Sequence, residues 1–306
     1  MCPLRSLRLV LTIGLCNLGL AACGADTPDP RLPVQPPTQS SAEAESAAWI
    51  DEPADPGGPQ GSAEAAVVAH LAAIRPPARW SYDGDSGPDR WAALSPQFVV
   101  CGAGSMQSPV DISPARVPSD PRLELIEFGY ASIPLWIMND GRVVQIANST
   151  PAAINAASET WRLREIQLHS PSEHSFDGKR SDLELQMLHV NDRGRLAVVS
   201  LLFRAGEKNE VLAPLFDALD GRITEDVELV PGASLDIAAL VPPAAGYFTY
   251  LGSLTTPGCA EDVRWFVLPP SGSVSPSQIE RLRAVTVPSS ARPIQPLGER
   301  QILRPH

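Results

Sequence analysis

Residues Glu165-Ile166-Gln167-Leu168-His169 alternate polar with apolar side chains. They overlap the end of a stretch, Trp161–Leu168, that has the period of a half-buried β-strand. A second stretch, Leu183–His189, has the same character and contains Glu184-Leu185-Gln186. Side chains at positions i and i+2 of a strand point to one face of the sheet. Gln167 and His169 are therefore expected on the same face.

Strand patterns dominate the chain on both sides of these two segments. Further strands are predicted at Leu123–Phe128, Leu135–Met138, Val143–Ile146 and Leu196–Phe203. Helical patterns are few, namely Glu210–Leu219 and Ser277–Val285, the latter behind a Ser-Pro start. The sequence thus predicts a single mixed, β-dominated domain over residues 78–306, with a central sheet and a few short helices.

The first 22 residues have the character of a secretory signal peptide. Arg5 and Arg8 precede a mostly apolar run, Leu9–Leu20, that is too short to span a bilayer as a helix. The run ends in Leu20-Ala21-Ala22-Cys23, which resembles the bacterial lipobox and implies cleavage before Cys23 and attachment of diacylglycerol to its sulfur. An ordinary secreted protein cut near the same place is the alternative. We expect an exported lipoprotein of the bacterial cell envelope, anchored to a membrane through Cys23. The residue after Cys23 is Gly24 and not Asp, which favours the outer membrane by analogy with lipoprotein sorting in enterobacteria.

Residues 23–77 hold Cys23 and a segment rich in Pro, Ala and acidic side chains. Such a composition cannot bury a core, so it predicts an extended tether. Ser62–Ile74 could form one short helix within it, with Ser62 as the N-cap and Pro76 beyond its end.

Cysteine positions fit this organisation. Cys2 and Cys16 would leave with the signal peptide and Cys23 would carry lipid, which leaves Cys101 and Cys259 in the domain. Two cysteines in an oxidising, exported compartment suggest one disulfide.

The chain is acidic, with a formal net charge of -11 and a pI near 4.9. This charge argues against nucleic acid as a partner and against electrostatic docking on anionic lipid. Hydrophobic residues make up 43% of the 306 residues, which is enough for one sizeable core.

The domain also carries an ordered series of motifs. They are Trp80-Ser81-Tyr82 with Gly87-Pro88-Asp89-Arg90-Trp91, Cys101 with Gln107-Ser108-Pro109-Val110-Asp111-Ile112, His169-Ser170-Pro171-Ser172-Glu173-His174 with Asp177-Gly178-Lys179, Leu183-Glu184-Leu185 with His189-Val190-Asn191, Tyr250-Leu251-Gly252-Ser253-Leu254-Thr255-Thr256-Pro257, and Arg292-Pro293-Ile294-Gln295-Pro296-Leu297. In this order and spacing they resemble the α-class carbonic anhydrases over essentially all of residues 78–306. The resemblance implies a central, mostly antiparallel twisted sheet of about ten strands and a Cys101–Cys259 disulfide.

The resemblance further implies a zinc site of three histidines, two at i and i+2 of one strand and one on its neighbour. Three neutral imidazoles leave a fourth position for water, whose pKa the metal lowers so that hydroxide attacks CO₂. In this sequence the three positions hold Gln167, His169 and Gln186. An amide oxygen is a poor zinc ligand beside imidazole. We therefore expect a degraded zinc site and no resident cofactor, with zinc present only if an atypical site works.

Other residues do not restore the missing ligands. The remaining histidines are His70 in the tether, His306 at the C-terminus, and His174 and His189 at positions where the resemblance implies internal hydrogen bonding. Glu165 and Glu184 share faces with the ligand positions, and the resemblance implies that they orient the ligands. Glu165 stands in place of a neutral residue and is the one that could reach a metal.

The rest of the implied site is partly retained. The resemblance pairs Thr255 with Glu173, so that the threonine hydroxyl donates to the carboxylate and orients the zinc hydroxide; packing in the core is the alternative role. Arg142 stands where active relatives carry a proton-shuttling histidine, and arginine cannot release a proton near neutrality. The implied cavity wall comprises Tyr82, Leu188, Val198, Leu254, Thr256 and Trp265. For Leu188, Val198 and Trp265, packing is the favoured explanation.

Three functions follow as hypotheses. The first is a lipid-anchored binding or structural module that has lost catalytic zinc. The second is a residual or functional carbonate dehydratase, which interconverts CO₂ and bicarbonate at an atypical zinc site. The third is a receptor for a small molecule or anion in the old cavity, with Arg142 at its mouth.

Overall fold

The computed structural model describes residues 78–219, 224–242 and 246–306. The chain divides into two units, Met1–Ala44 and Glu45–His306, and every described residue belongs to the second. The predicted signal peptide, Cys23, the tether and the helix expected at Ser62–Ile74 lie outside the described residues.

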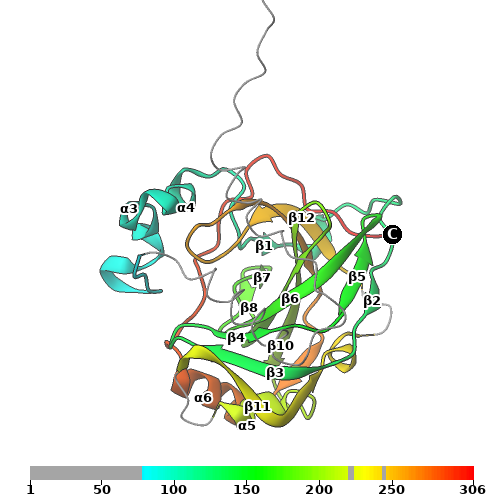
Figure 1. Ribbon diagram of the computed structural model, residues 1–306. Coiled ribbons are helices and arrows are strands. Elements are labelled where there is room, and N and C mark those ends of the chain that lie inside the picture. Colours follow the sequence, from blue (N-terminus) through cyan, green and yellow to red (C-terminus); the bar gives the residue numbers. More distant parts are fainter. Residues whose placement is uncertain (1–77, 220–223, 243–245) are drawn as a thin grey trace, which may run out of the picture. The chain divides into compact units, whose positions relative to one another are not determined.

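Eleven strands of the described chain form one large sheet (Figure 1). They are β2 (Glu127–Gly129), β3 (Ser132–Asn139), β4 (Val144–Ala147), β5 (Ala153–Ala156), β6 (Glu159–His169), β9 (Leu183–Val190), β10 (Leu196–Ala205), β11 (Thr224–Asp236), β12 (Phe248–Ser253), β13 (Glu261–Val267) and β14 (Gly272–Val274). The main order is β11-β3-β4-β6-β9-β10-β13-β12, while β5 pairs with β6, β2 with β5, and β14 with β10. The pairs are antiparallel except where β10 meets β13 and β14. The predicted β-dominated fold, with its large and mostly antiparallel sheet, is confirmed.

Three shorter strands form a second sheet. These are β1 (Asp111–Ile112), β7 (Ser175–Phe176) and β8 (Lys179–Arg180), joined in the order β1-β7-β8. β7 and β8 make a tight hairpin, and β1 pairs with β7 in parallel.

The strand predicted at Leu123–Phe128 is wrong over most of its length, because β2 begins only at Glu127. Asp120 causes the difference. Its carboxylate accepts from the backbone N–H of Arg122 at 3.0 Å, and its carbonyl accepts from the N–H of Leu123 at 3.0 Å. This turn keeps the following residues off the sheet, and the side chain of Leu125 is 49% exposed.

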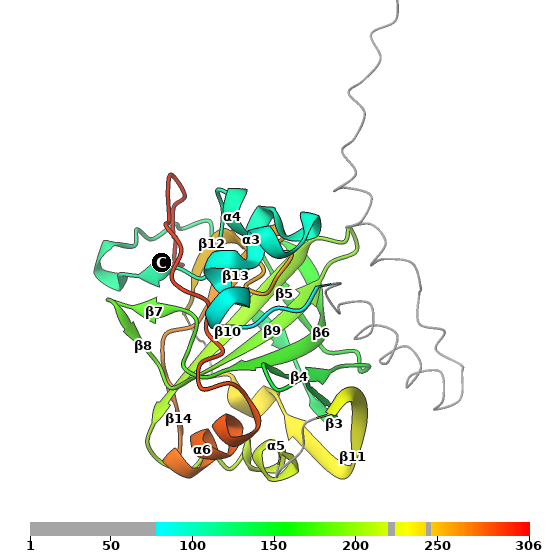
Figure 2. The same ribbon diagram turned by 90° about the vertical axis from the view of Figure 1, so that its left-hand side faces the viewer.

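Helices are short in the described residues. They are α3 (Trp91–Leu94), α4 (Val100–Ala103), α5 (Ala213–Ala218) and α6 (Pro276–Val285), with 3₁₀ turns at Gly84–Ser86, Pro88–Arg90, Pro96–Phe98, Pro114–Arg116 and Ala238–Leu240. α6 starts at a capping box between Ser275 and Gln278. The pair α3 and α4 lies at the opposite end of the sheet from α5 and α6 (Figures 1 and 2). Within the described ranges, none of the helices has the length and apolar character needed to cross a bilayer.

Strand alternation sorts the core into two parts, one on each face of the sheet. Ile166 and Leu168 of β6 join a large apolar cluster that includes residues of α5 and α6. Val198 of β10 and Trp265 of β13 belong to a separate apolar cluster. Gln167 and His169 alternate with Ile166 and Leu168, so they point away from the α5–α6 side. The candidate site therefore lies on the other face of the sheet.

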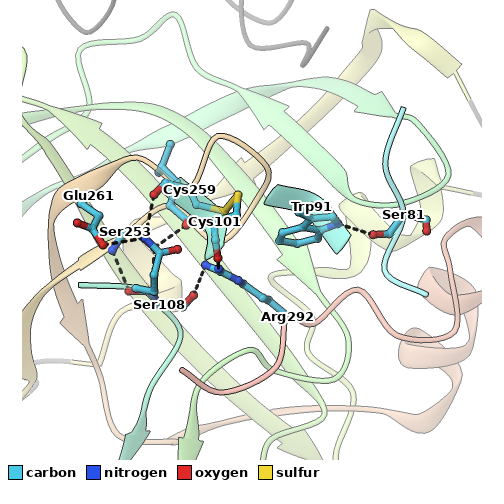
Figure 3. The surroundings of a disulfide bond; sticks show 10 residues. Ser81, Trp91, Cys101, Ser108, Ser253, Cys259, Glu261 and Arg292 are labelled. Carbon is cyan, nitrogen blue, oxygen red and sulfur yellow. Dashed lines mark hydrogen bonds between the residues drawn. A yellow bond between two sulfur atoms is a disulfide. The ribbon is translucent and has the colours of Figure 1, made fainter. Parts of the chain in front are cut away.

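A disulfide links Cys101 of α4 to Cys259, across 158 residues of chain (Figure 3). The predicted bond is present. Buried Arg292 lies beside it and donates to the carbonyl of Cys101 at 2.9 Å and to that of Ser108 at 2.8 Å. Its guanidinium also lies over the ring of Trp91, 5.6 Å from the centroid. One arginine thus ties the C-terminal segment to the disulfide and to the start of the domain.

Candidate functional site

The three positions that would hold zinc lie on adjacent strands. In the register of β6 and β9, Gln167 faces Gln186 and His169 faces Glu184. Directly opposed residues of an antiparallel pair have side chains on the same face. The structure therefore brings Gln167, His169 and Gln186 together on one side of the sheet, as the sequence predicts.

His169 is completely buried and has one engaged nitrogen. Nδ1 lies 2.6 Å from the carbonyl oxygen of Ser290, so Nδ1 carries the proton and donates. Nε2 has no hydrogen-bond partner among the described residues, and a carboxylate oxygen of Glu173 lies 3.8 Å from it. Ser290 was not predicted as a site residue; it lies in the loop after α6 and carries no motif of its own.

Gln167 is held by Glu165, two residues earlier on the same strand. Its amide nitrogen donates to Glu165 Oε1 at 2.6 Å. In this contact the amide nitrogen is the donor, so the nitrogen lies toward Glu165 and the carbonyl oxygen lies away from it. Glu165 is buried and supports position 167, which is the role that the resemblance implies for it.

Gln186 differs most from the expected arrangement. Its amide nitrogen donates to Glu173 Oε2 at 2.7 Å and to Glu184 Oε1 at 3.1 Å. The hydroxyl of Thr255 donates to Gln186 Oε1 at 3.4 Å. The direct Thr255–Glu173 bond that the resemblance implies is not formed in the described structure, because the amide of Gln186 bridges the two. The other oxygen of Glu173 accepts from the backbone N–H of Arg292 at 2.9 Å.

Glu184 anchors a buried hydrogen-bond network below the site. It accepts from His174 Nδ1 at 2.8 Å, from the Ser200 hydroxyl at 2.8 Å, and from the backbone N–H groups of Glu173 and His174. Burial alone would raise the pKa of this carboxyl, but His174 and these donors lower it to about 2. The carboxylate is therefore charged at neutral pH and can hold Gln186 in place.

The network continues through Tyr250 to the segment around Ser108. His174 Nε2 lies 2.7 Å from the hydroxyl of Tyr250, which lies 2.9 Å from the hydroxyl of Ser108. Burial raises the pKa of Tyr250 well above its ordinary value, so the phenol keeps its proton. The motifs contain Tyr250, but the sequence assigned it no role, because its partners come from distant parts of the chain.

Arg142 is fixed by its neighbours. It donates to Asp140 Oδ2 from Nε at 2.8 Å and from a terminal nitrogen at 2.5 Å, and to the carbonyl of Trp80 at 2.9 Å. Its guanidinium lies over the Trp80 ring, 4.4 Å from the centroid. Asp140 thus neutralises the cation that the receptor hypothesis places at the cavity mouth.

The apolar positions of the predicted wall form a row. Val198 pairs with Leu188 of β9 on one side and with Trp265 of β13 on the other. Val198 and Trp265 are fully buried, and Leu188 and Leu254 pack against their cluster. Thr256 is partly exposed, as is Leu254. Packing accounts for this row.

Tyr82 lies in an aromatic group with Trp80 and Trp91, with ring centroids 5.2 Å and 5.8 Å away. Burial raises the pKa of its hydroxyl well above the ordinary value, and the negative charge of Glu173 adds to this effect. Within residues 78–306, as far as they are described, the hydroxyl has no hydrogen-bond partner.

The donor set does not fit zinc. Position 169 offers one imidazole nitrogen, while positions 167 and 186 offer amides whose nitrogens are engaged with carboxylates. Nowhere in the described ranges do three or more His, Cys, Asp or Glu side chains gather in a way that could hold a metal ion. Zinc prefers nitrogen, sulfur and carboxylate ligands, so this arrangement lacks two of the three it would need.

The sequence and the fold match known proteins. The sequence pattern of the family described as eukaryotic-type carbonic anhydrase matches residues 86–306. A carbonic anhydrase from Nostoc sp. is 34% identical over 226 residues, which cover 73% of this chain and 85% of that protein. An α-carbonic anhydrase from Thermovibrio ammonificans, solved with the inhibitor sulfanilamide, superposes with a TM-score of 0.70 at 30% identity, covering 74% of this chain and all of the other. Dioscorin, solved in complex with ascorbate, gives a TM-score of 0.69 at 30% identity and covers 74% of this chain and 97% of the other.

Proposed function

The chain belongs to the eukaryotic-type carbonic anhydrase family, and from this premise we propose that it is a member that does not hold catalytic zinc and acts as a binding or structural module. The observation that carries the proposal is the chemistry of the ligand positions, where Gln167 and Gln186 stand beside a single histidine, His169. Each glutamine donates its amide to a buried carboxylate. The carboxylates of Glu165 and Glu173 therefore hold glutamine amides rather than a metal or its ligands.

A second argument comes from Thr255 and Glu173. In an active relative this pair would orient the metal-bound hydroxide, as the family resemblance implies. Here the amide of Gln186 lies between them and uses the carboxylate. The same substitution that removes a ligand therefore also removes the orienting hydrogen bond, so both losses impair CO₂ hydration.

The second candidate is a carbonate dehydratase with an atypical zinc site. It is favoured by the free Nε2 of buried His169, which lies 3.8 Å from a carboxylate oxygen of Glu173. Imidazole and carboxylate are both good zinc ligands. If Glu173 were to bind zinc, its hydrogen bond from the Gln186 amide would have to break. The loss of that bond opposes metal binding.

The ligand of a binding module is a separate question. Dioscorin has been solved with ascorbate, which supports a binding role for the fold without assigning this chain the same ligand. The receptor hypothesis places Arg142 at the cavity mouth. Because Asp140 neutralises Arg142, an anion in the cavity would have to rely on other groups.

We also propose that the chain is exported and anchored to a membrane through a lipid on Cys23, with the outer membrane as its location. The support is the Leu20-Ala21-Ala22-Cys23 motif after the short apolar run. Multiple acyl chains on one residue are sufficient for stable anchoring.

Metal analysis of the purified full chain tests the proposed function. We expect less than stoichiometric zinc by mass spectrometry, even after incubation with zinc and dialysis, and little CO₂ hydration by stopped flow. Stoichiometric zinc together with rapid hydration would overturn the proposal and favour the second candidate. A matched control is the variant His169→Ala, which should leave the metal content of the chain unchanged if His169 holds no zinc.

A further inference from the structure

A pocket lies outside the candidate site and uses none of its residues. It is formed by the β7–β8 hairpin, the end of β10, the start of β12 and the two prolines after β13, and its volume is about 560 Å³. Pockets of a few hundred Å³ are of the size that takes small molecules. Figure 2 shows the β7–β8 hairpin beside the end of β10.

The floor of this pocket is apolar and stiff. The rings of Phe176 and Phe248 are nearly fully buried and meet edge to face, with centroids 5.6 Å apart. Pro114, Pro269 and Pro270 complete the apolar lining. Proline rings have fixed backbone angles, so this surface loses little conformational freedom when it is covered.

Two cations border the floor. Lys179 of β8 and Arg204 of β10 are exposed, and neither side chain has a hydrogen-bond or ion-pair partner in the described part of the chain. Lys208, in contrast, forms an ion pair with Glu210 at 2.7 Å. Asp111 of β1, the strand that pairs with β7, is also occupied, because its carboxylate accepts from the Ser175 hydroxyl at 2.5 Å and from the Gly178 N–H at 2.8 Å. Two unpaired positive charges thus lie at one pocket of an acidic protein.

Paired strands carry the backbone of both cationic residues. Arg204 pairs with Ser273 in the register of β10 and β14. Lys179 pairs with Phe176 across the hairpin, and the N–H of Asp177 donates to the carbonyl of Ile112 at 3.0 Å. Both residues therefore stand on paired strands rather than on free loops.

We propose that this pocket binds a small organic carboxylate, with its anionic group between Lys179 and Arg204 and an apolar, ring-sized body on Phe176 and Phe248. Guanidinium and ammonium groups both donate to carboxylate oxygens. Asp177 also lines the pocket and repels a second negative charge. The site therefore favours a monoanion over a phosphate dianion. This proposal is independent of whether the family site holds zinc.

Two probes with the same ring and opposite charge test the proposal. Phenylacetate and phenethylamine are titrated into the purified full chain at low ionic strength, with binding followed by calorimetry and by ¹⁵N NMR. We expect saturable binding of phenylacetate, with shifts at residues 176–180 and 203–205, and weaker binding at high salt. Absence of saturable binding, or equal binding of phenethylamine, would overturn the proposal.

Charge variants give the matching control. Lys179→Gln and Arg204→Gln should each raise the Kd for phenylacetate about fivefold, and the double variant more than tenfold. Asp177→Asn should lower the Kd, because it removes a repulsive charge. Lys208→Gln, which changes the other lysine of the chain, should leave the Kd unchanged. A double variant that melts like the parent and keeps the parent Kd would show that binding lies elsewhere and contradict the proposal.

Discussion

The side-chain amide of Gln186 donates to Glu173 Oε2 at 2.7 Å, across the space between β9 and the loop that follows β6. Glu173 is completely buried, and its other oxygen accepts from the N–H of Arg292. A buried carboxylate needs such partners because its desolvation is costly. Gln186 therefore has a structural role in this chain, beyond the absence of an imidazole at its position.

The first prediction concerns that role. Gln186→Met keeps a similar volume but removes the donor to both Glu173 and Glu184, so it should lower the free energy of unfolding by about 1–3 kcal/mol. Urea denaturation measures the change. Gln301→Met, at an exposed position, is the control and should cost less than about 0.5 kcal/mol. Equal effects of the two changes would contradict the assigned role.

The second prediction concerns pH and His189. Burial lowers the pKa of this histidine to about 4, and its neutral ring donates from Nδ1 to the Met187 carbonyl and accepts the Tyr130 hydroxyl at Nε2. Between pH 6.5 and 4 the unfolded chain binds a proton that the folded chain does not, so the free energy of unfolding should fall as the pH falls. The loss from this group is about 3 kcal/mol over that window.

The variant His189→Gln isolates the effect. Its amide can replace both hydrogen bonds but does not titrate, so the difference in unfolding free energy between parent and variant should shrink toward pH 4. Urea denaturation at several pH values gives this difference. A constant difference from pH 7 to pH 4 would contradict a buried neutral His189.

The third prediction concerns the disulfide. Replacing Cys101 and Cys259 by Ser opens a loop of 158 residues in the unfolded chain. The chain-entropy relation gives a loss of about 5 kcal/mol for a loop of this length. Denaturation of the double variant measures the loss, and peptide mapping without reductant checks the bond in the parent. Two free thiols in the parent, or an unaltered midpoint in the variant, would contradict this contribution.

Local patterns predicted the interior strands well. The segment Leu183–His189 matches β9 to within one residue, and Leu196–Phe203 matches β10 to within two. Both strands are buried along nearly their whole length, so apolar composition and alternation are strong there. The spacing on β6 also placed Gln167 and His169 on one face correctly.

Strands with irregular composition escaped prediction for identifiable reasons. β11 contains Pro231 and Gly232 and pairs with β3 through two register shifts, so its local sequence has the character of a turn. β12 contains Gly252, where an added Cβ would lie 2.1 Å from the Ser108 hydroxyl oxygen and 2.7 Å from the Tyr250 ring. Such close approaches arise from tertiary structure, and no local pattern reports them.

The hydrogen bonds of the site were beyond sequence reasoning for a similar reason. The motifs located Thr255, Glu173 and Gln186, but the direction of the glutamine amide depends on which carboxylates surround it. Glu173 and Glu184 both lie within reach, and both accept from the amide nitrogen. The bridging position of Gln186 is therefore a property of the folded site.

The fourth prediction concerns the N-terminus. The full chain should partition into detergent when expressed in a bacterial host, whereas Cys23→Ser should release the protein or leave it unprocessed, because no lipid can be attached. Detergent phase separation and mass determination of the N-terminal peptide measure both effects. Cys16→Ser, within the predicted signal peptide, is the control and should behave like the parent. A Cys23→Ser protein that is cleaved and fractionates like the parent would contradict the lipid anchor.

The fifth prediction restores the missing chemistry. The double variant Gln167→His plus Gln186→His should bind zinc and hydrate CO₂ well above the parent. Position 167 shares a face with His169, position 186 lies opposite on β9, and Glu165 and Glu184 are already placed to accept from the new imidazoles. Removing the amide at position 186 also frees Glu173 to accept from Thr255. Each single change should recover less, since one amide would remain in the ligand set.

Two further variants and a buffer test complete this experiment. Adding His169→Ala to the double variant should abolish zinc binding, and adding Glu165→Gln tests whether a carboxylate at position 165 disturbs the new ligand at position 167. Hydration should depend on buffer, because Arg142 is bound to Asp140 and cannot carry a proton away. Zinc content by mass spectrometry and stopped-flow hydration are the measurements. If the double and triple variants fold but bind no zinc, the three positions do not form a metal site in this chain; if the parent already binds zinc and hydrates CO₂ rapidly, the two glutamines do not prevent catalysis.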